Sequence, residues 1–252
     1  MTVREHGVPA WKAAVLHGGP GGAGEAGPLA RAMAACGIAT LEPLQSAHSV
    51  DGQVEELRMQ LAARCDGPVD IVGWSWGAWL GCWLAARHPA MVRRLILVGC
   101  APFEEVDLEG IMALRLSRLS LDEARELQSG PSGGDISRML ALLKKADSFD
   151  PDDAPPPPVA FDPALHAAVW GEAKALRRNG DLLREVERIR CPVIAIHGDH
   201  DPHPAEGVRR PLAERLADVR FHRLENCGHA PWVERQARAL FLSLLEEIVS
   251  ER

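Results

Sequence analysis

The sequence predicts an α/β fold, in which a doubly wound, mostly parallel sheet of about six to seven strands carries an inserted helical cap. Short apolar runs alternate with longer amphipathic stretches, which is typical of strands and helices joined by right-handed crossovers. The alternation stops near residue 100 and resumes near residue 190, and the segment between has helical patterns but no strand pattern. We therefore expect residues 1–100 and 186–252 to form the sheet domain and residues 101–185 to form the cap.

Six apolar runs are expected to form strands of about five residues, the last of them half exposed. They are Ala13–Leu16, Ile38–Leu41, Val69–Val72, Leu95–Val98, Val193–Ile196 and Val219–Leu224. The amphipathic stretches between them predict helices at Pro28–Cys36, Val54–Cys65, Ala78–Arg87, Ala205–Leu216 and Glu234–Val249. Parallel strands need crossover connections, so we expect these helices to cover both faces of the sheet.

The predicted cap is helical. Its helical patterns cover Leu108–Leu119, Leu121–Gln128, Ile136–Lys145 and Ala164–Arg177. Prolines occupy the four consecutive positions Pro155–Pro158, and such a run cannot form a helix or a central strand. We expect an extended surface linker at that point.

The bulk composition indicates a globular protein with one large core. The chain has 252 residues, of which 46% are hydrophobic and 25% are charged. Its formal net charge is −7 and its basic residues are dispersed, which argues against nucleic acid or an anionic membrane as a partner. Charge or proline interrupts every apolar stretch before it reaches the length of a membrane span. We expect a small-molecule or short-peptide substrate and no cofactor, and the sequence leaves the oligomeric state open.

The six cysteines form no C-x-x-C pair, and several lie in apolar runs. A chain of this length does not need disulfides for stability, so we expect reduced, mostly buried thiols and a cytoplasmic setting. The segment Met1–Pro9 is polar and lacks the apolar centre of a signal peptide.

The stretch Gly73-Trp74-Ser75-Trp76-Gly77 carries the strongest functional signal. It matches the pattern G-x-S-x-G between a predicted buried strand and a predicted helix, where a serine sits on a sharp, strained turn. Glycine at positions 73 and 77 avoids clashes there, and the helix N-terminus favours a developing negative charge. The sequence therefore predicts Ser75 as a nucleophile. The alternative is that Ser75 only caps the helix.

A glycine-rich loop, His17–Gly22, follows the first predicted strand. Such a loop can bind phosphate, but it fits the dinucleotide pattern poorly, and no G-K-[ST] is present. Instead, we expect it to present backbone N–H groups to a negatively charged carbonyl oxygen. The expected donors are the N–H groups of Gly19 and Trp76, and His17 is expected to be a structural hydrogen-bonder rather than a base.

Two later loops supply the candidate acid and base. Asp201 follows the predicted strand Val193–Ile196, at the edge of a parallel sheet where ligands bind. Asp199 is the alternative acid, but its position suits it better to fixing the turn. His229 follows a glycine before the last helix and is expected to accept the Ser75 proton while Asp201 holds its other ring nitrogen.

Three motifs resemble the α/β-hydrolase family, and within it the proline iminopeptidase branch. They are HGGPGG at 17–22, GWSWGA at 73–78 and GHAPWVER at 228–235, within a likeness that covers about residues 12–100 and 190–250. The resemblance implies the chain order Ser…Asp…His for the triad. It also implies cleavage of N-terminal residues, especially proline, from short peptides.

The sequence departs from that branch in three respects. The family's antiparallel hairpin is shortened, because only about ten residues precede the first parallel strand. A proline, Pro202, follows Asp201 where the branch has a carboxylate. The acids that in the branch hold the substrate ammonium have no matching motif in this cap, so its candidate acids are expected to be solvated: Glu104, Glu105, Glu109, Asp152 and Asp153.

We therefore expect a serine hydrolase that cleaves an ester or an amide through an acyl-enzyme. Trp74 and Trp232 are candidates for the substrate pocket, Trp76 is a further one, and Trp79 and Trp83 are expected in the core. A ligand receptor that retains the triad, a thioesterase and a carbon–carbon bond hydrolase remain alternatives. A metal hydrolase is a further alternative, because histidines and aspartates cluster at His197, Asp199, His200, Asp201 and His203.

Overall fold

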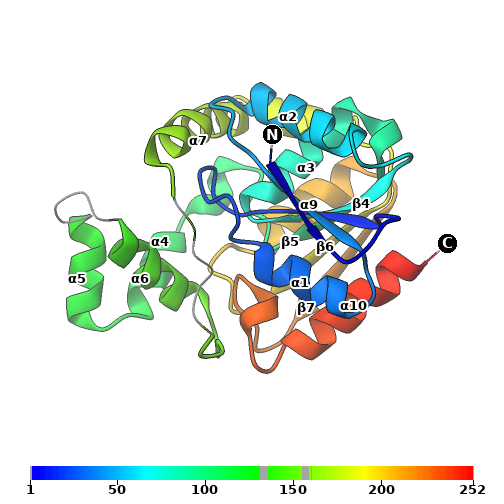
Figure 1. The fold of residues 1–252 in the computed structure, drawn as a ribbon. Helices are drawn as coiled ribbons and strands as arrows, with labels where there is room; N and C mark the ends of the chain where they lie inside the picture. Colours follow the sequence, from blue (N-terminus) through cyan, green and yellow to red (C-terminus); the bar gives the residue numbers. More distant parts are fainter. Residues whose placement is uncertain (1, 131–135, 155–158, 160, 252) are drawn as a thin grey trace.

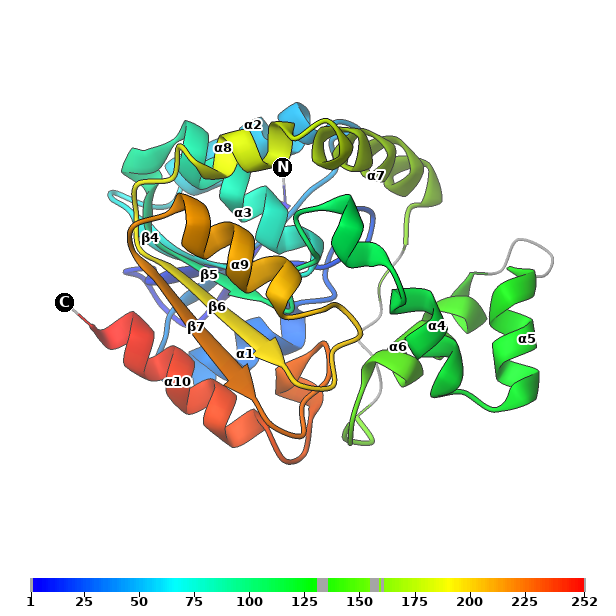
Figure 2. The same ribbon diagram turned by 180° about the vertical axis from the view of Figure 1, so that it is seen from behind.

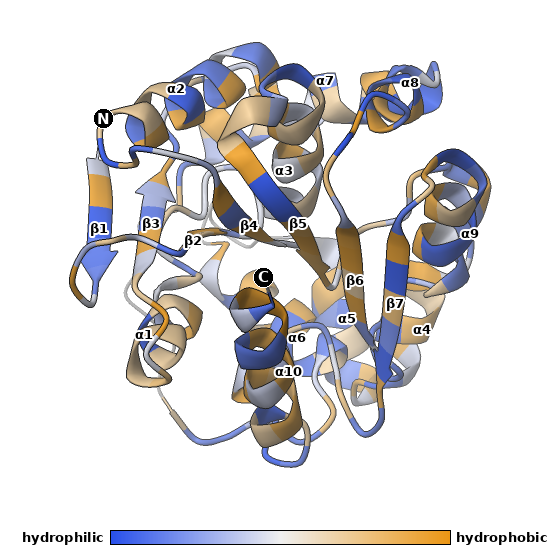
Figure 3. Ribbon diagram, turned by 90° about the vertical axis from the view of Figure 1, so that its right-hand side faces the viewer, coloured by the Kyte–Doolittle hydropathy of each residue, from blue (hydrophilic) through white to orange (hydrophobic). Residues whose placement is uncertain are grey.

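The computed structural model describes residues 2–130, 136–154, 159 and 161–251. Within them, one sheet has seven strands in the order β1-β3-β2-β4-β5-β6-β7, and their labels can be followed in Figure 3. The strands are β1 (Thr2–His6), β2 (Ala13–Leu16), β3 (Thr40–Leu44), β4 (Val69–Trp74), β5 (Val92–Val98), β6 (Val193–Gly198) and β7 (Val219–Leu224). All neighbouring pairs are parallel except β1 with β3. The predicted fold class is confirmed.

Helices cover both faces of the sheet, as Figure 3 shows. α1 (Gly27–Ala35) and α10 (Arg238–Ser250) pack on one face. The other face is covered by α2 (Val50–Ala62), α3 (Trp76–Arg87), α8 (Asp181–Val186) and α9 (Glu206–Arg215). Side chains of β2 alternate between the two faces, with Ala14 and Leu16 facing α3 and with Ala13 and Val15 facing α1.

The segment predicted as a cap divides into two parts in space. α4 (Ile111–Ser117), α5 (Leu121–Ser129) and α6 (Ser137–Asp147) form a lobe beside the sheet domain (Figures 1 and 2). α7 (Pro163–Arg178) instead contacts α2 and α8, and its buried residues join the core on that face. Short 3-10 turns complete the chain at η1 (Pro89–Met91), η2 (Glu105–Leu108) and η4 (Pro231–Val233). The predicted proline linker, Pro155–Pro158, lies outside the described residues.

The strand β1 was not predicted. It lies at an edge of the sheet, and its side chains are polar except for Val3 and mostly exposed, so it lacks an apolar pattern. Backbone pairing with β3 holds it, from Thr2 opposite Leu44 to His6 opposite Thr40. The buried Glu42 of β3 also lies 2.9 Å from His6 Nε2. Within the described residues, one antiparallel strand therefore precedes the first parallel strand, β2.

All six cysteines lie in the described part of the chain and are free thiols. Cys82, Cys100 and Cys227 are buried, and the other three are partly exposed. Among the described helices, none is long and apolar enough to cross a membrane.

Asp70 in β4 is a buried charge that the fold depends on. Its carboxylate accepts hydrogen bonds from Arg93 Nε (2.8 Å) and Arg94 Nη1 (3.3 Å). We expect Asp70→Asn to lower the free energy of unfolding by about 3 kcal/mol, because it leaves the buried Arg94 guanidinium without its counter-charge. Urea denaturation measures the change. Asp51→Asn is the control, since its carboxylate is 75% exposed, and its pairing with Arg87 contributes less than about 1 kcal/mol. Equal losses in the two variants would contradict this account.

Candidate active site

Ser75 lies on a sharp turn between β4 and α3. Its backbone has φ 53° and ψ −113°, and Asn226 is the other described non-glycine residue with positive φ. Such a conformation costs free energy and persists only where neighbouring structure enforces it. Here the Ser75 N–H donates a hydrogen bond to the Val98 carbonyl of β5 at 3.0 Å. The side chain of Ser75 is partly exposed, so it remains reachable.

The two glycines of the motif are required by close backbone approach. A Cβ at Gly73 would lie 2.3 Å from the Gly77 carbonyl oxygen, and a Cβ at Gly77 would lie 2.5 Å from the Leu16 carbonyl oxygen. Neither position has room for a side chain. These contacts bring the start of α3 against the end of β2, where the glycine-rich loop begins.

That loop, His17–Gly22, lies beside the nucleophile turn. Gly18 packs on the indole of Trp74, since a Cβ at this glycine would lie 2.6 Å from the ring. Among the described residues other than its two chain neighbours, no atom lies within 4 Å of the Cβ position of Gly19, whose φ is 41°. His17 is buried, and its Nδ1 lies 2.8 Å from the Gly18 carbonyl oxygen. Burial lowers the pKa of His17, so this ring is neutral and its expected structural role is consistent with its surroundings.

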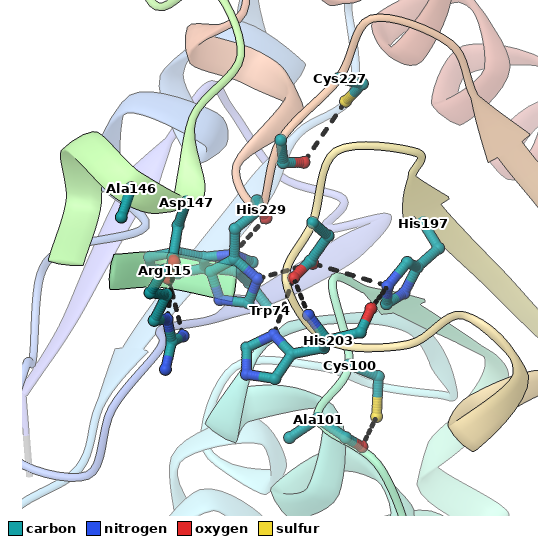
Figure 4. A network of polar contacts seen from close by, with 12 residues as sticks. Trp74, Cys100, Ala101, Arg115, Ala146, Asp147, His197, His203, Cys227 and His229 are labelled. Atoms are coloured by element: carbon teal, nitrogen blue, oxygen red, sulfur yellow. Dashed lines mark hydrogen bonds and ion pairs between the residues drawn. The ribbon is translucent and has the colours of Figure 1, made fainter. Parts of the chain in front are cut away.

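Asp201 and His229 are hydrogen-bonded. His229 Nδ1 lies 2.7 Å from Asp201 Oδ2, a contact drawn as a dashed line from the labelled His229 in Figure 4. The Asp201 carboxylate is fully buried. The alternative acid, Asp199, instead accepts the Cys227 N–H at 3.1 Å and so fixes the turn. Gly99, directly after β5, allows the approach, because a Cβ there would lie 3.0 Å from His229 Nδ1.

The pKa values of His229 and Asp201 are set by burial and by the charges nearby, which act in opposite directions. Burial would lower the pKa of His229, but the Asp201 charge and hydrogen bond outweigh it, and the pKa is raised above its ordinary value. For Asp201, burial would raise the pKa, yet the nearby imidazoles of His229, His203 and His197 hold it well below its usual range. Asp201 therefore stays ionised, and His229 is more basic than a free imidazole.

The residue before Ser75 ties the nucleophile turn to the His229 loop. Trp74 Nε1 donates to the His229 carbonyl oxygen at 2.9 Å, and the two rings lie 5.4 Å apart. Ser75, Asp201 and His229 thus follow β4, β6 and β7, and all three lie at the carboxyl ends of the strands, where the sequence predicts them. Their action as a triad remains a prediction, as do the N–H groups of Gly19 and Trp76 as oxyanion donors.

The tryptophans around the turn differ in their surroundings. Trp74 is partly exposed and packs edge-to-face on Trp232 at 4.9 Å, so the two pocket candidates form one cluster. The side chain of Trp76 is 2% exposed and packs against Trp83 and Trp170, so it belongs to the core and not to a pocket wall. Trp79 and Trp83 are buried in the same core, as predicted.

Glu234 is a site residue that the sequence did not reveal. Its side chain is fully buried and accepts three backbone N–H groups, from Gly228 (3.1 Å), Phe149 (3.0 Å) and Asp150 (2.7 Å). The His229 N–H also donates to the carbonyl oxygen of Asp147, the last residue of α6, at 2.8 Å. The lobe is therefore hydrogen-bonded directly to the loop that carries His229. Glu234 lies in the motif GHAPWVER, but only the fold shows what it binds.

Glu25 is a second residue near the site that no sequence pattern indicates. Its carboxyl lies against the glycine-rich loop, since a Cβ at Gly22 would be 2.8 Å from Glu25 Oε2. Burial raises the pKa of Glu25 to about 7, although the positive charges of His229 and Lys144 oppose the rise. Near neutral pH the Glu25 carboxyl, which lies beside the expected oxyanion loop, is therefore protonated in a fraction of the molecules.

The histidines and aspartates that suggested a metal hydrolase make other interactions in the fold. His197 Nε2 lies 2.9 Å from the His203 carbonyl oxygen, and the His200 ring packs on Phe149 at 5.3 Å. Within the described residues, the three groups placed to share a metal ion are Asp201, His203 and His229. These three are joined by hydrogen bonds between their own side chains. Their donors thus fit an acid–base network better than a dedicated metal site.

The charge balance at His229 gives a pH prediction. We expect Asp201→Asn to lower the pKa of His229 below the value of a free imidazole, because burial then acts without the opposing charge. NMR titration of the His229 ring protons measures this pKa in both proteins. The reference signal is His88, at the far end of α3, whose pKa should not change. An unchanged or raised pKa of His229 in the variant would refute the proposed balance.

Comparison with known proteins identifies relatives among bacterial enzymes. A protein of Neisseria meningitidis serogroup A, named pimeloyl-[acyl-carrier protein] methyl ester esterase, is 27% identical over 79% of this chain. The matched region spans 64% of that relative's length. A protein of the same name from Nitrosomonas europaea is 26% identical, over 78% of this chain and 75% of the relative.

Solved structures share the fold. The crystal structure of VinJ matches with a TM-score of 0.71 and 20% identity, covering 98% of this chain and 93% of that one. Proline iminopeptidase from Mycobacterium smegmatis matches with a TM-score of 0.65 and 18% identity, over 98% and 93% of the two chains. The sequence profile of the α/β-hydrolase family covers residues 13–241. The chain belongs to the α/β-hydrolase family.

Proposed function

We propose that this protein is a serine esterase in which Ser75, His229 and Asp201 cleave a carboxylic ester through an acyl-enzyme. The observation that carries the proposal is the buried Asp201–His229 hydrogen bond beside the strained turn of Ser75. Trp74, the residue before Ser75, donates to the His229 carbonyl oxygen at 2.9 Å and so ties the turn to the loop of this imidazole. Nucleophilic acyl transfer requires a serine and an oriented, basic imidazole in one site.

The steps follow from the placement of the ring nitrogens. Because Nδ1 of His229 donates to Asp201, Nε2 is the nitrogen available to take the proton from Ser75 Oγ. The Oγ then bonds to the ester carbonyl carbon, and the resulting oxyanion is bound by the N–H groups of Gly19 and Trp76. His229 returns the proton to the departing alkoxide, which leaves as an alcohol. Water, deprotonated by His229, then releases the acid and restores Ser75.

The relatives support ester over amide chemistry, since several curated proteins at 26–28% identity are named esterases. The resemblance to proline iminopeptidases points the other way, but those enzymes need carboxylates free to hold the substrate ammonium. Four of the five cap acids considered for that purpose are paired with arginines: Glu104 with Arg210, Glu105 with Arg177, Asp152 with Arg238 and Asp153 with Arg235. We therefore favour an ester substrate that carries no ammonium group.

The substrate class we propose is a small alkyl ester of an acyl chain, of the kind that the relatives' name describes for a carrier-bound acid. The partly exposed ring of Trp74, which packs on the buried Trp232, provides apolar surface next to Ser75 in the chain for such an acyl group. Repeated turnover of such an ester separates this proposal from a receptor that retains the triad. A hydrolysed thioester or carbon–carbon bond would instead favour the other two alternatives.

Active-site labelling tests the nucleophile. We expect a fluorophosphonate probe to label the wild-type protein and to spare Ser75→Ala, because the probe bonds to an activated serine oxygen. Ser117→Ala is the matched control, since this serine of α4 donates its hydroxyl to the Leu114 carbonyl oxygen and should leave labelling intact. Labelled protein is measured by in-gel fluorescence and mass spectrometry. Equal labelling of wild type and Ser75→Ala would exclude Ser75.

A substrate panel tests the bond that is cleaved. We expect kcat/KM for the methyl ester of a medium-chain acid, free or attached to acyl-carrier protein, to exceed that for a prolyl arylamide. The ratio should be at least about tenfold, the loss caused by one missing hydrogen bond to a charged group. Steady-state product release measures both. Faster cleavage of the prolyl arylamide would contradict the esterase proposal and favour an aminopeptidase.

A further inference from the structure

We propose that His203 is a positioning residue, which holds the Asp201 carboxylate toward His229 and thereby sets the pH range of catalysis. This inference rests on the proposed esterase function. His203 is the second residue after Asp201, and neither the motifs nor the expected triad assign it a role.

The imidazoles of His229 and His203 each bind one oxygen of the Asp201 carboxylate. Asp201 Oδ2 takes the bond from His229 Nδ1 at 2.7 Å, and Oδ1 lies 2.8 Å from His203 Nδ1 (Figure 4). Oδ1 also accepts the backbone N–H of His203 at 3.0 Å. The carboxylate is fully buried, so these protein donors replace the water that would otherwise solvate it. With both oxygens bound, the carboxylate cannot rotate away from His229.

The loop fixes His203 as firmly as it fixes Asp201. His197, a buried residue of β6, lies with Nε2 2.9 Å from the His203 carbonyl oxygen and 3.7 Å from Asp201 Oδ2. Pro202, between the acid and His203, restricts the backbone. The His203 ring therefore reaches Oδ1 without losing much conformational freedom at the moment of catalysis.

His203 acts as a neutral donor. Burial lowers its pKa, while the Asp201 charge and hydrogen bond only partly oppose this, and the proximity of His229 lowers it further. The rings of His203 and His229 lie 4.9 Å apart. A neutral ring can stabilise the carboxylate without repelling the imidazolium that His229 becomes during the reaction. Several other titratable groups of the described residues lie around these three. They are Arg115 of α4, Arg118 directly after α4, Asp147 of α6, His197 of β6, Glu25 near the glycine-rich loop, and the thiols of Cys100 and Cys227.

Removing the donor should therefore change both the rate and its pH dependence. In His203→Phe the ring volume is kept, but Oδ1 loses its side-chain donor, so more of the negative charge acts on His229. We expect the acid limb of kcat/KM to move upward by roughly half a pH unit or more. We expect kcat at the optimum to fall about tenfold, because the carboxylate loses one hydrogen bond. The KM should change little, since His203 acts through Asp201 and not through the substrate.

His203→Asn tests whether the donor itself matters. The asparagine side-chain amide can occupy nearly the position of Nδ1, so we expect it to restore the wild-type acid limb and most of kcat. His203→Gln moves the amide one methylene farther and should behave like His203→Phe. His200→Phe is the matched control, because this histidine lies in the same loop and packs on Phe149, and its profile should equal that of the wild type.

The measurement is the pH profile of kcat and KM for one p-nitrophenyl ester, with thermal melting of each variant. A shifted limb in His203→Phe and a restored one in His203→Asn support the proposal. Should the phenylalanine variant fail to fold, the comparison of His203→Gln with His203→Asn decides the same question. Wild-type profiles in every folded His203 variant, or equal losses in Asn and Gln, would overturn it.

Failure of the esterase proposal would look different. A wild-type protein that neither hydrolyses the ester nor reacts with the fluorophosphonate probe refutes the proposed function itself. A wild type that turns over and is labelled, with His203 variants that match its pH profile, refutes only the role of His203.

Discussion

The left-handed turn at Ser75 is the constraint on which the rest of the site depends. It leaves no room for a side chain at Gly73 or Gly77, so the end of β4, the start of α3 and the end of β2 meet in backbone contact. The hydrogen bond from Ser75 N–H to Val98 ties the turn to β5 as well. Three neighbouring strands thus enforce one strained residue, and the free energy that the strain costs comes from their packing.

A second constraint couples the helical lobe to the base. The Asp147 carbonyl oxygen at the end of α6 accepts the His229 N–H, and the Asp147 carboxylate is held by two hydrogen bonds from Arg115 of α4. Glu234 binds the N–H groups on both sides of this junction. Any displacement of α4 and α6 therefore acts on the main chain of His229 directly, without an intervening flexible loop.

Elements that carry a local apolar pattern can be predicted from the sequence. Elements that depend on pairing with distant parts of the chain cannot. The strands β2 and β7 appear with their predicted bounds, because apolar periodicity marks both of them. β1 carries no such pattern, since its stability comes from backbone pairing with β3. Ser75, Asp201 and His229 follow motifs at strand ends. Glu234 and Glu25 look like ordinary surface acids until folding buries them beside backbone donors and a glycine-rich loop.

The Asp201 carboxylate shows why such a site needs more residues than a triad. A fully buried carboxylate is costly to keep ionised, and both oxygens of Asp201 therefore have donors: His229 on Oδ2, and the ring and backbone N–H of His203 on Oδ1. A lysine or arginine in place of His203 would keep Asp201 ionised but would repel the imidazolium formed during the reaction. A neutral imidazole donor avoids both problems, since it stabilises the anion and adds no charge. Under the proposed mechanism, the geometry around Asp201 is therefore better explained by the positive charge that forms on His229 than by the packing of the loop.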